Sequence, residues 1–152
     1  MTSISYDDIF EFFLGYINDY NIISMNKNDA YEIFTEFLHK TVAKPYVRKL
    51  FVSITLNDNR EILSYQLKIQ SDNDFVTDVL AKGMVVEWLQ KQIKSPDHLH
   101  QFFGGKEQKW FSQATHLAEL RGLLKDAKGE FRRLINSYTY INNSYLGESS
   151  ET

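Results

Sequence analysis

Cysteine is absent from this chain of 152 residues. Its absence excludes a disulfide framework and a zinc site built on thiolates. It also fits a protein kept in a reducing cytoplasm, where disulfides are rare.

Long apolar runs are missing as well. The longest, such as Phe12-Phe13-Leu14, are far too short to span a bilayer, which takes about 20 residues. The first residues, MTSISYDD, lack the basic segment and apolar run of a secretory signal. We therefore expect a soluble protein that is made and used inside a cell and has no membrane partner.

The sequence offers no nucleotide-binding motif that its chemistry supports. Gly104-Gly105-Lys106 resembles part of a phosphate-binding loop, but that loop needs Ser or Thr after the lysine and lies between a strand and a helix. Here Glu107 follows the lysine, and the preceding segment is predicted to be a short helix beginning at Ser95. The glycines are better explained as the end of that helix, because glycine suits the left-handed turn past a helix C-terminus.

Metal-binding and acid–base patterns are equally weak. His98 and His100 are two positions apart, so on a helix they point in different directions and do not chelate together. Asp7, Asp8 and Glu11 begin a predicted helix, where the helix dipole favours acids. No Ser-His-Asp or Cys-His arrangement can be argued. We expect no enzymatic activity, no catalytic residues, no metal and no cofactor.

What the sequence has in abundance is hydrophobic and aromatic side chains, at 43% and 14% of the residues. With no internal repeat or long linker, this composition predicts one domain with a substantial core. Helical spacing of apolar residues predicts helices at about 5–20, 28–44, 75–93 and 112–141, whereas alternation at about 50–70 predicts a β-hairpin, the only β signal. The predicted fold class is mainly α, a helical bundle of four to five helices with a long C-terminal helix and one inserted β-hairpin. Residues 1–141 form this domain, and residues 142–152 are expected to be a flexible tail.

Capping and packing residues refine this prediction. Ser5, Ser71 and Ser112 are predicted N-caps, the first two with an acid three positions later. Gly83, in the most hydrophobic helix, is predicted to let another helix approach closely. In the last helix, apolar residues recur at spacings of three and four and predict its packing face: Leu117, Leu120, Leu124, Ala127, Phe131, Leu134 and Tyr138.

Charge is distributed unevenly along the chain. Residues 1–81 hold 7 basic and 12 acidic side chains, whereas residues 82–133 hold 10 basic and 6 acidic ones. This polarity either favours head-to-tail attraction between copies or reflects only solvated faces that differ. Lys125, Lys128 and Arg132 have the spacing of one basic stripe, a candidate for contact with DNA phosphates. Interleaved acids and a pI near 5.8 favour a solvated or protein-facing helix instead.

Two stretches of the chain resemble a known group of proteins. They are VLAKGMVVEWLQKQI (79–93) and QFFGGKEQKWFSQATHLAELRGLLKD (101–126). The shared pattern is a central helix with A-K-G-M-x-x-E-W-L, an F-x-G-x-K loop and a long helix. It falls on Ala81, Lys82, Gly83, Met84, Glu87, Trp88 and Leu89, then on Phe103, Gly105 and Lys106. In these residues the chain is similar to small virion structural proteins of tailed phages (siphophages) and prophages of Gram-positive bacteria, the neck or head–tail connector (adaptor) proteins.

The resemblance implies a non-enzymatic, mainly helical subunit that forms a twelve-membered ring beneath the portal. Its implied partners are other copies of itself, the portal protein and the next neck or tail protein, with non-specific contact to packaged DNA. It implies assembly in the host cytoplasm and a place at the head–tail interface of the virion. Loops and extended termini grip neighbours in such proteins, which makes these residues interface candidates: Phe102, Phe103, Lys106, Trp110, Tyr138, Tyr140, Tyr145 and Leu146.

Two alternatives stay open at the level of sequence. The hairpin departs from the smallest all-helical adaptors, which also fits a tail-completion or capsid-associated structural protein. A small DNA-binding or regulatory protein that uses the basic last helix is the other alternative. In any assembly, an edge strand of the hairpin is a candidate for pairing with an extended segment of a neighbour.

Overall fold

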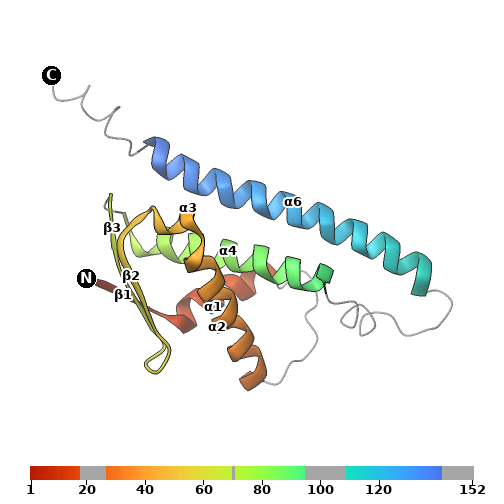
Figure 1. Cartoon of the computed structure of the whole chain (residues 1–152), viewed down its shortest axis with the longest axis horizontal. Coiled ribbons are helices and arrows are strands. Elements are labelled where there is room, and N and C mark those ends of the chain that lie inside the picture. The colour runs from red at the N-terminus through yellow and green to blue at the C-terminus, as the bar shows by residue number, and fades with distance from the viewer. Residues whose placement is uncertain (18–26, 70, 95–108, 142–152) are drawn as a thin grey trace.

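The structure is a computed structural model, and it describes residues 1–17, 27–69, 71–94 and 109–141 (Figure 1). Residues 27–29, 109–116 and 139–141 are described by their backbone alone. The predicted short helix from Ser95 to the Gly104-Gly105 pair and the predicted tail at 142–152 lie outside the described residues. The predicted helix at 5–20 is seen as far as Ile17.

The described chain is mainly helical, as the sequence predicts, and has a small antiparallel sheet at one end. The helices are α1 (Tyr6–Ile17), α2 (Lys27–Ala43), the one-turn α3 (Pro45–Arg48), α4 (Asn73–Lys94) and α6 (Lys109–Ile141). The strands are β1 (Thr2–Ser5), β2 (Phe51–Asn57) and β3 (Ile62–Leu67). The second helix ends at Ala43 because Pro45 disfavours a helical conformation at Lys44, whose ψ of 129° is extended.

The sheet has three strands in the order β1-β3-β2, all antiparallel. The hairpin predicted at about 50–70 is confirmed, but the prediction that it is the only β structure is wrong. Thr2–Ser5 pairs with β3, with Ile4 opposite Leu63. The four residues Thr2–Ser5 are too few to show a recognisable alternation of apolar and polar side chains. They form a strand because β3, distant in the sequence, supplies their hydrogen-bond partners. The hairpin is therefore not isolated, and β3 is its central strand.

Helix α4 is the centre of the molecule. In Figure 1 it lies between α6 on one side and α1 and α2 on the other. Half of its residues are buried, on more than one face, as expected for a helix covered on two sides. Its N-cap is one residue later than the sequence predicts, because the Asp72 side chain, not that of Ser71, accepts the amide proton of Phe75 (3.0 Å). At the start of α1, the predicted Ser5 cap is confirmed by the hydrogen bond from the Asp8 amide (3.2 Å).

Gly83 has the packing role that the sequence predicts. A Cβ atom added to Gly83 would lie closer than 3.0 Å to Cγ2 of Thr41 on α2 and 3.1 Å from Cζ of Phe131 on α6. Both of these side chains are buried. Glycine at this position therefore allows the two flanking helices to meet α4 at the same level.

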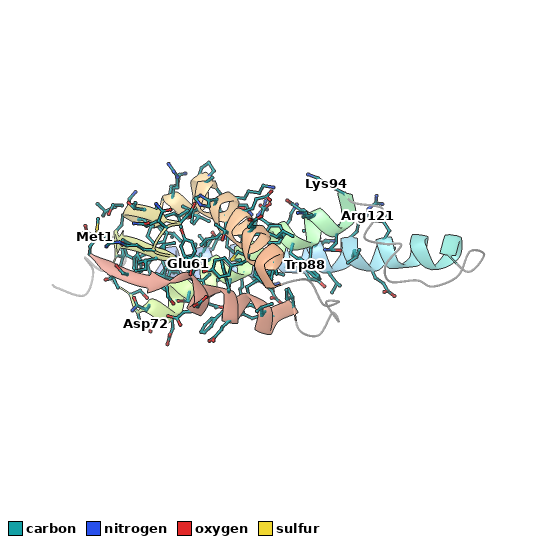
Figure 2. All side chains as sticks on the ribbon, turned by 90° about the horizontal axis from the view of Figure 1, so that it is seen from below. Met1, Glu61, Asp72, Trp88, Lys94 and Arg121 are labelled. Atoms are coloured by element: carbon teal, nitrogen blue, oxygen red, sulfur yellow. The ribbon has the colours of Figure 1, made fainter. Side chains whose placement is uncertain are left out.

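Helix α6 spans 33 residues, about 50 Å at 1.5 Å per residue. It runs antiparallel to α4, and its amino-terminal turns, before Arg121, continue past the end of α4 at Lys94 (Figure 2). It begins at Lys109, so the prediction of Ser112 as its cap is wrong. The predicted packing face is confirmed, because Leu120, Phe131 and Tyr138 are buried and the other four residues of the series are half-buried.

Candidate interaction surface

Most of the predicted interface residues lie where no side chain is described. Phe102, Phe103, Lys106, Tyr145 and Leu146 lie outside the described residues, and for Trp110 and Tyr140 the structure gives only a place on the backbone of α6.

Tyr138 is the exception, and it belongs to the core of the single chain. Its ring stacks on Phe75 with centroids 4.2 Å apart, and its hydroxyl donates to the carbonyl oxygen of Ile69. Only 7% of the residue is exposed, and burial raises the pKa of its hydroxyl. This contact joins α6 to the start of α4 and to the segment after β3.

The exposed side of α6 carries an arrangement of charged residues that the sequence predicts only in part. Four of its basic residues, at spacings of four, three and four, lie within about 60° of arc at 100° per residue. We call them the basic flank: Arg121, Lys125, Lys128 and Arg132, all exposed. The predicted basic stripe of Lys125, Lys128 and Arg132 therefore lies on the surface of the helix.

The acids that interleave with these residues in the sequence are separated from them in space. Glu119, Asp126 and Glu130 are also exposed, and their spacings of seven and four place them within about 40° of arc. We call them the acidic flank. The two flanks are about 150° apart and lie on either side of the buried face. Helix α6 thus gathers most of its exposed charges into one basic and one acidic flank, with the exposed Arg133 between them and nearer the acidic flank.

Neither flank is neutralised within the described part of the chain. The ion pairs found among those residues are His39–Asp58, Lys40–Glu36, Lys44–Glu87 and Lys82–Asp78, and none of these uses a residue of α6. The nearby Arg133 donates from Nε to the carbonyl oxygen of Gly129 (3.2 Å) rather than to an acid. No flank residue therefore forms an ion pair among the residues that the structure describes.

A largely buried ion pair lies beside α6. Lys44 lies 2.9 Å from Glu87 of α4 (Nζ to Oε1), and the two side chains are only 17% and 13% exposed. The same Nζ lies 5.4 Å from the ring centroid of Phe131, and the ring of Tyr46 meets Phe131 edge-on at 5.7 Å. Glu87 belongs to the motif quoted above, so that motif marks the junction at which α2, α3, α4 and α6 meet.

A second polar cluster ties the tip of the β2–β3 turn to the helices. Asp58 accepts from the hydroxyl of the buried Tyr6 (2.7 Å), and Nε2 of His39 lies 2.9 Å from its Oδ1. These hydrogen bonds, Tyr6 first and His39 second, hold the pKa of Asp58 below its ordinary value. Burial, and then the same carboxylate, raise the pKa of Tyr6. The cluster connects α1, α2 and the turn. We call these three residues, Tyr6, His39 and Asp58, the Asp58 clasp.

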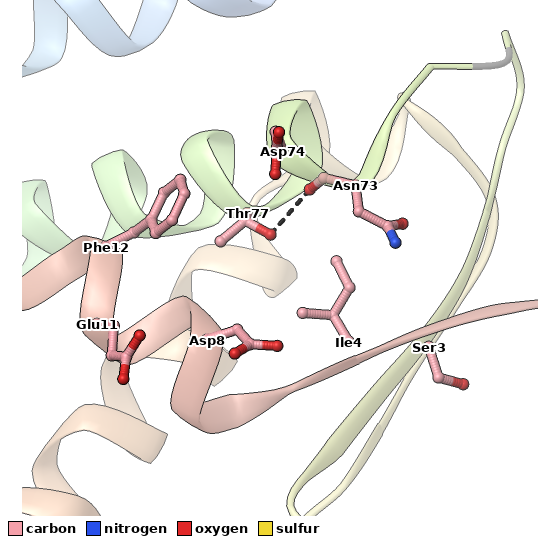
Figure 3. Close-up of a pocket in the computed structure, with 8 residues that line it drawn as sticks. All are labelled: Ser3, Ile4, Asp8, Glu11, Phe12, Asn73, Asp74 and Thr77. Atoms are coloured by element: carbon pink, nitrogen blue, oxygen red, sulfur yellow. Dashed lines mark hydrogen bonds between the residues drawn. The ribbon is translucent and has the colours of Figure 1, made fainter.

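A cavity of about 350 Å³ opens between β1, α1 and the start of α4 (Figure 3). Asp8, Glu11 and Asp74 contribute carboxylates to its lining, while the Thr77 hydroxyl is occupied in donating to the carbonyl oxygen of Asn73 (2.8 Å). Among the residues that the structure describes, no group of three or more His, Cys, Asp or Glu side chains is arranged to hold a metal ion. The acids at the start of α1 thus contribute to a polar hollow and to the first turn of a helix.

Comparison with known proteins adds no relative. No family model, curated protein or solved structure matches this chain. The resemblance to connector proteins therefore rests on the motif residues alone. Within the described residues, no helix is long and apolar enough to cross a membrane.

Proposed function

We propose that this chain is a non-enzymatic virion structural protein, a head–tail connector (adaptor) subunit that forms a ring at the phage neck between portal and tail. The observation that carries the proposal is the arrangement of α6. The helix packs against α4 along one face, exposes both charged flanks, and extends past the end of α4. Such an element suits a subunit whose task is to contact other proteins.

The motif residues of the resemblance support this proposal through their positions. Gly83 lets α2 and α6 meet α4, and Glu87 binds Lys44 beside Phe131. These motif residues thus constrain how closely the long helix packs on α4. A ring subunit needs that constraint, because a small change in the angle of its contacting element changes how the ring closes.

A ring also needs two unlike surfaces on each copy, since a heterologous contact closes by rotation. The two flanks of α6 are unlike in charge. The sheet offers a further surface at β2, where the register shifts between Phe51 and Ser53 and Val52 is 62% exposed. A bulge of this kind twists an edge strand, which limits uncontrolled pairing while leaving room for a specific partner.

Composition of purified virions tests the proposal. Particles from a producing strain should contain the chain at a fixed ratio to the portal protein, measured by quantitative mass spectrometry. A strain that lacks the gene should accumulate filled heads and free tails that do not join, and the gene supplied on a plasmid should restore joining. Mature particles without any copy of the chain would refute the proposal. A tail-completion or capsid-associated role would instead give copies that purify with isolated tails or with heads lacking a neck.

The basic flank supports a second candidate, a small DNA-binding protein. Lys125, Lys128 and Arg132 are exposed on one side of one helix, as phosphate contacts require. A salt-sensitive mobility shift that disappears when all three are changed to Ala would support it. The matched control removes the same number of charges by changing to Ala the residues Arg48, Lys49 and Lys68, which are also exposed but lie outside the flank.

A further inference from the structure

The two flanks of α6 match each other in length and position. The basic flank runs from residue 121 to 132 and the acidic flank from 119 to 130, so each covers about 16 Å of helix. They are offset by two residues, about 3 Å. Each acid therefore has a base two positions further along, namely Arg121 for Glu119, Lys128 for Asp126 and Arg132 for Glu130. Long Lys and Arg side chains readily span such an offset.

This match is useful only between two copies of the helix. Within one α6 the flanks are about 150° apart and cannot meet. If two α6 helices lie side by side and parallel, with their buried faces turned toward their own bodies, the basic flank of one faces the acidic flank of the other. An antiparallel pair in the same arrangement places like charges together. Charge complementarity therefore selects the parallel arrangement.

We infer that α6 forms the contact between neighbouring copies of this chain, with the basic flank of one copy against the acidic flank of the next and the two helices parallel. The inference deepens the proposed function and rests on it for the ring. Each copy contacts one neighbour through its basic flank and the other neighbour through its acidic flank. The contact is therefore heterologous, and repeating it adds copies until the ring closes.

Nucleic acid fits the same surface less well than a second copy does. The acidic flank lies across a helix about 10 Å in diameter, a distance comparable to the Debye length of about 10 Å at 0.1 M salt. Phosphates at the basic flank therefore feel the acids as well, and the chain as a whole carries a net charge of −3. A second α6 instead makes use of both flanks.

Two charge-reversed variants of the full chain test the inference. One carries Lys125→Glu, Lys128→Glu and Arg132→Glu; the other carries Glu119→Lys, Asp126→Lys and Glu130→Lys. All six positions are exposed, so each variant should keep the wild-type circular dichroism spectrum and thermal midpoint. In light-scattering mass measurements, each variant alone should self-associate about 10- to 100-fold more weakly than wild type, because attraction becomes repulsion.

Mixing the two variants is the decisive step. The first variant then has two predominantly acidic flanks, because Arg121 is unchanged, and the second has two basic flanks, so the equimolar mixture should regain association. Association should also weaken as salt is raised. A wild-type chain that stays monomeric, variants that associate like wild type, or a mixture that stays monomeric would each overturn the inference. A monomeric wild type that binds duplex DNA through Lys125, Lys128 and Arg132 would overturn it in favour of nucleic acid.

The outcomes separate this inference from the proposed function. Charge-dependent self-association of a chain that never enters virions would leave the α6 contact in place and remove the connector role. Normal incorporation of both reversed variants into virions would leave the connector role in place and remove the α6 contact.

Discussion

Replacing Gly83 by alanine should destabilise the protein, although alanine is the better helix former. Helix propensity alone favours Gly83→Ala by about 1 kcal/mol. The added methyl group, however, would lie closer than 3.0 Å to Cγ2 of Thr41 and 3.1 Å from Cζ of Phe131. Thr41 is fully buried, and its hydroxyl donates to the carbonyl oxygen of Phe37 (2.8 Å), so its rotamer is held in place.

The expected size follows from the packing. Inserting a methylene-sized group into a packed core costs about 1–3 kcal/mol. Subtracting the gain in propensity of about 1 kcal/mol leaves a net loss of up to about 2 kcal/mol in the free energy of unfolding. Urea titration followed by circular dichroism at 222 nm measures this loss as a lower midpoint at unchanged slope.

Two further variants make this test specific. Gly122 is also in the middle of a helix, but nothing lies within 4 Å of a Cβ added there, so Gly122→Ala should stabilise the chain by about 0.5–1 kcal/mol. Thr41→Ser removes Cγ2 and keeps the hydroxyl, so in the double variant Gly83→Ala should cost less than it does alone. If Gly83→Ala raised the midpoint as Gly122→Ala does, the close approach of three helices at this glycine would be refuted.

Three other perturbations probe the remaining contacts. The pKa of Asp58 is lowered in the folded state from about 3.8, so the contribution of Asp58 to stability is complete above that value and is lost as the pH falls through the lower folded-state pKa. Asp58→Asn should remove this loss of stability at acid pH from unfolding curves measured as a function of pH. An unchanged pH dependence would contradict the clasp with Tyr6 and His39. Lys44→Met should lower the free energy of unfolding by about 3 kcal/mol, because it leaves Glu87 buried without its partner, and the added change Glu87→Leu should recover most of that loss. If the effects of the two changes on the free energy of unfolding were simply additive, the result would argue against the ion pair. Deleting residues 142–152 should leave the thermal midpoint unchanged and weaken incorporation into particles, whereas unchanged incorporation would count against docking by the tail.

Local patterns were sufficient to predict the four longer described helices and the hairpin, whereas the one-turn helix α3 was not predicted. Ser5 caps α1 through the Asp8 amide, and Pro45 ends α2, because both effects depend on neighbours in the sequence. Gly83 was recognisable because a glycine inside the most apolar helix suggests close packing, and the structure identifies Thr41 and Phe131 as its neighbours.

Features that depend on distant residues were not predictable in this way. Thr2–Ser5 is a strand only because β3 pairs with it, and four residues carry no periodicity of their own. The Asp58 clasp joins residues 52 and 19 positions apart, which no spacing rule connects. The cap at Asp72 rather than Ser71 reflects a choice between two adjacent good N-cap residues that local sequence does not decide.

The candidate surface was predicted only in part. Lys125, Lys128 and Arg132 were recognisable as a stripe, but the acids between them in the sequence seemed to dilute it. The acids lie beside the basic residues in the sequence but not on the surface of the helix. On the helix, Glu119, Asp126 and Glu130 gather on the opposite side of the buried face, which turns a weak basic stripe into two complementary flanks.

A cryo-electron microscopy reconstruction of the neck of an intact virion tests the central claim most directly. A connector role with the α6 contact predicts a ring between portal and tail in which each subunit shows the antiparallel α4–α6 pair, with α6 about 50 Å long and parallel to α6 of the adjacent subunits. Contact between Lys125, Lys128 or Arg132 of one copy and Glu119, Asp126 or Glu130 of the next should be visible at side-chain resolution. A neck that is fully accounted for by other proteins, with no density for this chain, would contradict the account.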